Sequence, residues 1–458
     1  MTQVDKPAEN SAWLRLMPRF VQAKLSGRSN LQAALSNTSW LSMSTVLRLG
    51  LGLLVGLWVA RYLGPSRFGQ LNYAIALTSL FAALASLGSN SIVIRELVKS
   101  PEQKDVLLGS AMTLRLIGSA LAMLVVIFLV KLMRPGDTLT LWLVVLSAVG
   151  FILQSINVID LYFQAKVESR YTVFSSLGAF VLMGLLKVLL ISIRAPLIDF
   201  AWAGLGEGIL TAGFLSLAFS LKNQSMRKWR PDFAVMMAIL KDSWPLILAG
   251  ISTMIYLRVD QVLIGQMLND KEVGLYSAAA RISEIWYFIP ATICSSTLPA
   301  LIASKKQNPA LYFSRLQKLA NLLVRVALVV AVVMTFLSKP IITLLYGHSY
   351  EGAWPALSVL IWSGIPYSFG GAWGSWMTVE NRTGTIFLFH ANAAVVNLLL
   401  NFILIPRYGI VGSAYATLIS YWIGHTVLAA IMKSQHEALL MLAKALIPIP
   451  SLFKSKLT

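Results

Sequence analysis

Nine charged residues lie well inside long apolar stretches of this 458-residue chain, and they are the side chains best placed to do chemistry. A charge in hydrocarbon costs about 2.5–3.5 kcal/mol on insertion scales, so such residues usually face water, a ligand or a partner charge. The set contains more bases than acids, which favours an anionic ligand. The bases are Arg48, Arg115, Lys187, Arg258, Arg281 and Arg325, and the acids are Glu207, Asp260 and Glu284.

The six basic residues predict a binding site for an anion. A guanidinium donates two parallel hydrogen bonds to phosphate oxygens, whereas a Lys ammonium offers only a point charge. Arg48 has no acid near it in the sequence and is the strongest candidate ligand, followed by Arg258 and Lys187. Arg115 and Arg325 lie nearer one end of their segments, where a long side chain can also reach the membrane surface.

The three acids predict coupling or gating. Arg258 and Asp260 are two residues apart, so they point to different faces of a helix. Asp260 is then either a site for a coupling ion or proton, or the counter-charge of an arginine. Arg281 and Glu284 share one helix face, where they either pair with each other or line a cavity, and such a pair could open as a gate. Glu207 is a weaker candidate proton acceptor.

The elements that carry these residues are predicted membrane helices. The chain is 57% hydrophobic and only 12% charged, with a mean hydropathy of +0.71. Helices satisfy their own backbone groups in lipid, and apolar runs of about 20 residues are long enough to cross it. We predict an all-α polytopic protein with twelve spans, near residues 33–60, 69–94, 106–130, 139–160, 171–193, 197–221, 243–268, 274–303, 318–338, 354–378, 383–405 and 410–432.

A basic segment divides these spans into two lobes of six around a central cavity. The predicted boundaries are an N-terminal segment 1–32, a first lobe 33–221, a linker 222–242, a second lobe 243–433 and a tail 434–458. Residues 12–25 and 436–453 mix apolar and basic residues, as helices at a membrane surface do. Gly52 and Gly56 are four apart, a spacing typical of helix packing.

Loop charges predict the orientation. If the N-terminus is cytoplasmic, 24 of the 38 Lys and Arg residues fall in cytoplasmic segments, 8 in outer loops and 6 within spans. This bias places both termini in the cytoplasm.

Two outer loops resemble each other and predict an internal repeat. Residues 63–69 read LGPSRFG and residues 268–274 read LNDKEVG, each leading into the second span of its half. Two similar six-span halves are a transporter architecture, in which the substrate is held between halves that rock. Because six is even, both halves have the same orientation and the repeat axis lies along the membrane normal.

Several function classes are excluded by what the sequence lacks. There is no Gly-rich nucleotide loop of the G-x-x-x-x-G-K-[ST] form, so ATP is not bound in that way. The single cysteine, Cys294, and four scattered histidines predict no metal site and no cofactor. No converging catalytic groups stand out, so we expect no enzyme. The net charge of +19 reflects cytoplasmic loops rather than nucleic-acid binding.

Residues 244–306 carry a specific resemblance. The segments YLRVD (256–260), VGLY (273–276), IWYFIP (285–290) and LP (298–299) resemble bacterial polysaccharide flippases of the Wzx type, in the superfamily of multidrug, oligosaccharidyl-lipid and polysaccharide exporters. Further similar pieces are RYLGP at 61–65, and Asn397 and Asn401 followed by IP at 405–406. The resemblance extends over about residues 33 to 435.

The resemblance implies a flippase for undecaprenyl-diphosphate-linked oligosaccharide, working by alternating access in the bacterial inner membrane. It implies contact with membrane lipids, coupling to a proton or sodium gradient, and cooperation with polysaccharide polymerase and ligase proteins. A peptidoglycan-precursor flippase or a multidrug antiporter of the same fold is the alternative, and a membrane polysaccharide ligase or polymerase is a more distant one. The excess of basic residues within the spans argues against the organic cations of a multidrug pump.

Overall fold

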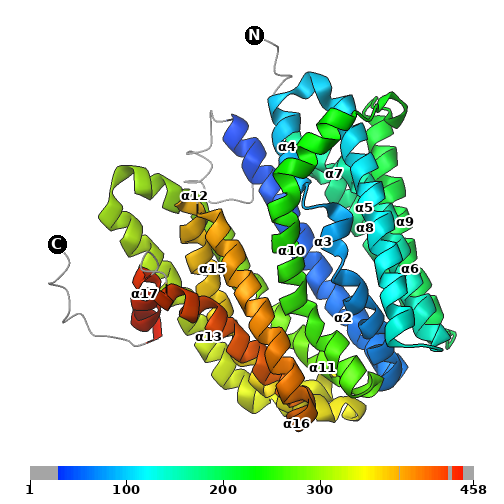
Figure 1. Cartoon of the computed structure of the whole chain (residues 1–458), viewed down its shortest axis with the longest axis vertical. Coiled ribbons are helices and arrows are strands. Elements are labelled where there is room, and N and C mark those ends of the chain that lie inside the picture. Colours follow the sequence, from blue (N-terminus) through cyan, green and yellow to red (C-terminus); the bar gives the residue numbers. More distant parts are fainter. Residues whose placement is uncertain (1–28, 381, 432–435, 447–458) are drawn as a thin grey trace.

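The computed structural model describes residues 29–380, 382–431 and 436–446, and every regular element in these ranges is helical. The predicted surface segment 12–25 lies outside the described residues. The helices form two lobes that lie close together at one end and draw apart toward the other (Figure 1).

The first lobe holds the helices up to residue 221, on the right in Figure 1. They are α2 (Ser29–Ser79), α3 (Ala82–Ser86), α4 (Asn90–Lys99), α5 (Lys104–Met133), α6 (Thr138–Gln154), α7 (Val158–Ala165), α8 (Arg170–Ser192) and α9 (Leu197–Leu221).

The second lobe begins with α10, which lies between the two groups of helices in Figure 1. Its helices are α10 (Phe233–Met267), α11 (Asp270–Ile285), α12 (Phe288–Gln307), α13 (Pro309–Tyr346), α14 (Trp354–Leu360), α15 (Gly364–Val379), α16 (Thr383–Ile431) and α17 (His436–Leu446). The chain is therefore a multi-pass, all-helical membrane protein, as predicted.

The described residues contain nine helical segments long and apolar enough to cross a membrane. Two of them contain a sharp turn at a glycine with non-helical backbone angles. α2 covers the predicted span 33–60 and the first part of the span 69–94, which continues in α3 and α4, and α16 covers the spans 383–405 and 410–432. The interrupted helix pair α14–α15 corresponds to one more predicted span. The twelve predicted spans are all accounted for in this way.

Glycines with positive φ make the two sharp turns. Gly64 has φ 69° and precedes Pro65, and Gly409 has φ 59° and follows Pro406. A left-handed conformation is inexpensive for glycine alone, and proline cannot donate the helical hydrogen bond, so each pair reverses the chain within a few residues. The predicted spans leave residues 61–68 as the connection at the first turn and residues 406–409 as the connection at the second.

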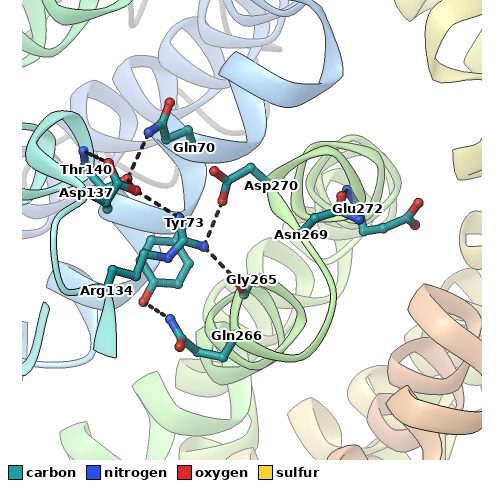
Figure 2. A network of polar contacts seen from close by, with 10 residues as sticks. All are labelled: Gln70, Tyr73, Arg134, Asp137, Thr140, Gly265, Gln266, Asn269, Asp270 and Glu272. Atoms are coloured by element: carbon teal, nitrogen blue, oxygen red, sulfur yellow. Dashed lines mark hydrogen bonds and ion pairs between the residues drawn. The ribbon is translucent and has the colours of Figure 1, made fainter. Parts of the chain in front are cut away.

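Side-chain caps fix where several other helices begin. Asp137, Asn269 and Asn308 each accept a hydrogen bond from a backbone N–H in the first turn of α6, α11 and α13. Such caps satisfy donors that have no partner within the helix. The capping residues of α6 and α11, Asp137 and Asn269, lie on opposite sides of Arg134 in the region that joins the lobes (Figure 2).

The predicted C-terminal amphipathic segment is described only at residues 436–446. There it forms α17, which lies against α13 and buries Met441, Leu442 and Ala445. Gln317 on α13 donates a hydrogen bond to the carbonyl oxygen of Met441 at 3.0 Å. The helix is thus packed on the second lobe through its apolar face.

Candidate functional site

A cavity of about 580 Å³ lies among α2, α6, α8 and α9 of the first lobe. This volume falls within the usual range of small-molecule sites. Four of the nine sequence-predicted site residues line it: Arg48, Lys187, Glu207 and Arg281. They come from four different helices, so the fold brings together charges that are up to 233 positions apart, from 48 to 281.

Glu207 connects two of the cations. Its carboxylate lies 3.0 Å from Nη2 of Arg48 and 3.8 Å from Nζ of Lys187. The Arg48 guanidinium also lies over the ring of Phe180, 5.1 Å from its centroid. Since the Arg48 side chain is 41% exposed, the ion pair is open to a ligand rather than closed within the protein.

Arg281 reaches the same cavity from the second lobe. It lies on α11, and its Nη2 donates a hydrogen bond to the carbonyl oxygen of Gly52 on α2 at 3.0 Å. The guanidinium lies against Gly56, where an added Cβ would be 2.9 Å from Cζ. The two glycines predicted to pack helices therefore also admit an arginine side chain.

The cavity has three cations and one carboxylate among its lining residues. Two positive charges remain after Glu207 is counted, and they face a space large enough for a small anion and part of its carrier. This arrangement can bind a diphosphate.

Arg258 and Glu284 form a separate pair in the second lobe. The arginine makes two hydrogen bonds to the carboxylate, Nη1 to Oε1 at 3.1 Å and Nη2 to Oε2 at 3.2 Å. Glu284 therefore pairs across helices with Arg258, and the same-helix pair considered for Arg281 and Glu284 does not form. Both side chains are about one-third exposed.

Asp260 lies on another face of α10, as its spacing from Arg258 predicted. It is 3% exposed and accepts hydrogen bonds from Tyr276 at 2.5 Å, Thr417 at 2.6 Å and Asn401 at 2.7 Å. Asn401 also accepts a hydrogen bond from Ser413 at 2.7 Å. Among the described residues no cationic side chain pairs with Asp260, so its charge is compensated by neutral hydroxyl and amide donors alone.

Arg115 and Arg325 lie away from the cationic cavity. Arg115 is 4% exposed and bonds to Ser89 and Asn90, beside a second cavity of about 130 Å³ that Asp160 also lines. Its burial shows that it does not extend to the membrane surface. Arg325 lies on the exposed face of α13 near Lys318.

A polar network joins the lobes at one end, and it centres on Arg134 at the end of α5 (Figure 2). The guanidinium lies 2.7 Å from Oδ1 of Asp270 on α11 and donates to the carbonyl oxygen of Gly265 on α10 at 2.9 Å. It also lies over the ring of Tyr73, 3.8 Å from the centroid. We call residues 61–74, 134–140 and 265–274 the sealed end.

Neighbouring charges hold Arg134 in its ionised form. Burial works against the charge, but the hydrogen bond and charge of Asp270 and the nearby Asp137 raise the pKa of Arg134 above its ordinary value. For Asp137 burial also works against ionisation, but the hydrogen bonds from Thr140 and the charge of Arg134 lower its pKa. Both shifts favour the ionised forms of Arg134 and Asp137 at neutral pH.

The two segments predicted to be repeats of each other, residues 63–69 and 268–274, meet in the sealed end. A Cβ added to Gly69 would lie 1.7 Å from the carbonyl oxygen of Asp270, and one added to Gly274 would lie 2.0 Å from that of Pro65. Backbone therefore packs directly on backbone between α2 and α11. Glycine at the end of each segment permits this close approach, because any side chain there would meet the facing backbone.

Sequence reasoning missed the role of Arg134 and Tyr73. Arg134 was counted only as an outer-loop charge, because its partners lie in other segments of the chain. The repeated glycine turns were the available signal, since they mark the place where the two halves touch.

The two lobes, the membrane helices and the charged cavity define a polytopic transporter-like protein. Residues 34–305 match the family described as polysaccharide biosynthesis protein, and since this is more than half of the chain, the chain belongs to that family. This confirms the resemblance noted in the sequence.

Two curated relatives that match part of the chain are named as flippases. "Probable flippase AglR" of Haloferax volcanii is 29% identical over 192 residues, 39% of this chain and 38% of that protein. "Probable low-salt glycan biosynthesis flippase Agl15" of the same organism is 24% identical over 226 residues, 48% of this chain and 47% of that protein. The chain thus matches less than half the length of these two relatives. Since flippases are transporters, these names agree with the expectation that the chain is a transporter rather than an enzyme.

Solved structures confirm the fold. An inward-facing multidrug resistance MATE family transporter of the MOP superfamily aligns with a TM-score of 0.68 and 15% identity, covering 87% of this chain and 95% of that one. The lipid II flippase MurJ in an inward closed conformation aligns with a TM-score of 0.65 and 18% identity, covering 91% of this chain and 93% of that one.

Proposed function

We propose that this chain moves undecaprenyl-diphosphate-linked oligosaccharide repeat units from the inner to the outer leaflet of the bacterial inner membrane by alternating access. The observation that carries the proposal is the first-lobe cavity, where Arg48, Lys187 and Arg281 face one carboxylate, Glu207. A diphosphate is the part of such a cargo that needs cations. The family and the relatives named as flippases support the same direction.

The proposed orientation has both termini in the cytoplasm. The loop-charge bias supports it, and it makes the sealed end the outer end, because residues 61–67, 131–134 and 271 belong to the predicted outer loops. In this conformation cargo would enter from the cytoplasmic leaflet. Outward movement would require the sealed end to part.

We propose that Asp260 binds the coupling ion, either a proton or sodium. The carboxylate is buried among the oxygen-bearing side chains of Tyr276, Asn401 and Thr417, which come from α11 and α16. A buried carboxylate without a cationic partner gains most from taking up a proton or a small cation. Because these helices all belong to the second lobe, the ion would act on the packing of that lobe.

The proposed partners follow from the cargo. Membrane lipids surround the spans, and polysaccharide polymerase and ligase proteins would receive the exported lipid-linked units. No cofactor is required, because positioning and charge are enough for translocation.

A stability measurement with graded ligands tests the cargo class. A ligand that binds only the folded protein raises its unfolding temperature. We expect an isoprenyl diphosphate to stabilise the purified chain more than the matching monophosphate, and an organic cation to have no effect. Stabilisation by the organic cation alone would instead favour the multidrug alternative.

A further inference from the structure

Arg281 differs from the other residues that line the first-lobe cavity. All the others belong to the segments between α2 and α9, and among the described lining residues Arg281 alone comes from the second lobe. One of the cavity's three cations is therefore carried by the lobe that must move.

Two glycines of α2 make this entry possible. The carbonyl oxygen of Gly52 accepts a hydrogen bond from Arg281 at 3.0 Å. At Gly56 a methyl group would lie 2.9 Å from Cζ and 3.0 Å from both Nη1 and Nη2 of Arg281. Any side chain at position 56 would push the guanidinium away, and the flexible arginine would yield before the backbone did.

The position of Arg281 is tied to the sealed end. It lies on α11, the helix whose Asp270 and Gly274 pack on Gly69 and Pro65 of α2. When these contacts part, α11 moves away from α2, and the contact between Arg281 and Gly52 cannot survive that movement.

We infer that Arg281 is an affinity switch for the diphosphate of the cargo. With the sealed end closed, three cations and Glu207 surround the anion. When the sealed end is open, Arg281 moves away from the cavity, and only Arg48 and Lys187 remain beside Glu207. The cavity therefore loses affinity for the diphosphate at the step at which it opens to the other side, and the cargo is released there.

This inference rests on the proposed diphosphate cargo, and it differs from a purely structural role for Arg281. A residue that only joined the lobes would change the stability of the closed state and leave ligand affinity in that state unaltered. A charged contact to an anion is worth roughly a ten- to hundredfold change in affinity. Affinity is therefore the quantity that separates the two roles.

The test measures binding of farnesyl diphosphate to the purified full-length chain. We expect Gly56→Ala and Arg281→Ala each to weaken binding by roughly tenfold or more. The matched control is Gly50→Ala on the same helix, where a methyl group meets no atom within 4 Å, and it should bind as the parent does. Because both changes act through one guanidinium, the Gly56→Ala, Arg281→Ala double variant should bind no more weakly than Arg281→Ala alone.

A second arm links affinity to the state of the lobes. Gly274→Ala places a methyl group 2.0 Å from the carbonyl oxygen of Pro65 and forces the sealed end apart. It should weaken farnesyl diphosphate binding in the parent and cause no further loss in the Arg281→Ala background. An equal loss in both backgrounds would overturn the switch.

The outcomes also separate this inference from the proposed function. Binding that falls with Arg48→Ala but not with Gly56→Ala or Arg281→Ala overturns the switch and leaves the cargo assignment standing. If the parent and Arg48→Ala bind farnesyl diphosphate equally weakly, the assignment of a diphosphate cargo is wrong, and the inferred role of Arg281 is then wrong as well.

Discussion

At the scale of single residues, the molecule separates two kinds of charge. The cations Arg48, Lys187 and Arg281 face a cavity, whereas Asp260 is enclosed by hydroxyl and amide groups in the other lobe. Cargo recognition can then reside mainly in the first lobe and ion coupling in the second, while α11 reaches both sites, through Arg281 at the cavity and through Tyr276 at Asp260. Their communication must pass through the helices that join the lobes.

Neutralising Asp260 should uncouple transport from the ion gradient. Asp260→Asn keeps the shape and can still accept hydrogen bonds, but it has no charge to exchange for a proton or sodium. We expect flipping in proteoliposomes to lose most of its gradient dependence, while farnesyl diphosphate affinity stays within about threefold, because Asp260 is not among the residues that line the cavity.

The control for this change is Asp242→Asn on the same helix. Asp242 is 49% exposed and pairs with Arg95 at the surface, so its removal should leave the gradient dependence intact. Gradient-driven flipping by Asp260→Asn at the parent rate would contradict the coupling role.

At the scale of helices, the closest packing lies in the sealed end. The Arg134 network and the Gly69–Gly274 contact both connect α2 or α5 to α10 and α11. Since interiors are close-packed, a single added methyl group in a backbone-to-backbone contact cannot be absorbed without movement.

Gly274→Ala should therefore expose this end of the molecule. A suitable reporter is Phe68→Cys in a Cys294→Ala background, because Phe68 is 3% exposed and lies next to Gly69. We expect an impermeant thiol reagent on the outside to modify the reporter several times faster when Gly274→Ala is present. Equal protection in both backgrounds would show that the contact does not hold the lobes together.

The helices and their order could be predicted from the sequence, but the pairing of charges could not. Hydropathy locates α9 at 197–221, the range the pattern predicted, because length and apolarity are local properties. Glu284 was placed next to Arg281 by helix spacing, yet it bonds to Arg258 on α10. The choice between these partners depends on how α10 packs on α11, which no local pattern encodes.

The same limit explains the position of Arg48. No acid is near it in the sequence, whereas Glu207, 159 residues away, pairs with it. Long-range pairing also decides that Arg115 is buried beside Ser89 rather than reaching the membrane surface.

At the scale of the whole molecule, orientation decides the direction of transport. Both Lys271 in the sealed end and Lys228 between the lobes are exposed, and the loop charges predict them on opposite sides. In a Cys294→Ala background in intact cells, Lys271→Cys should react with an impermeant thiol reagent and Lys228→Cys should not. The opposite labelling pattern would invert the topology and make the sealed end cytoplasmic.

The energy source is a further property of the whole molecule. The sequence has no nucleotide-binding loop, so flipping in proteoliposomes should proceed with an ion or substrate gradient and no ATP. A strict requirement for ATP in the absence of any gradient would contradict the mechanism.

Translocation of the proposed cargo is tested most directly by the rate at which the purified chain moves a fluorescent undecaprenyl-diphosphate oligosaccharide across sealed proteoliposomes. We expect gradient-dependent transfer by the parent, a loss of roughly tenfold or more in Arg48→Ala, and partial retention in Arg48→Lys, since Lys keeps the charge without the paired hydrogen bonds. Arg407→Ala, at an exposed arginine away from the cavity, should behave as the parent. Transfer at the parent rate by a well-folded Arg48→Ala protein, or no transfer by the parent at all, would contradict the claim.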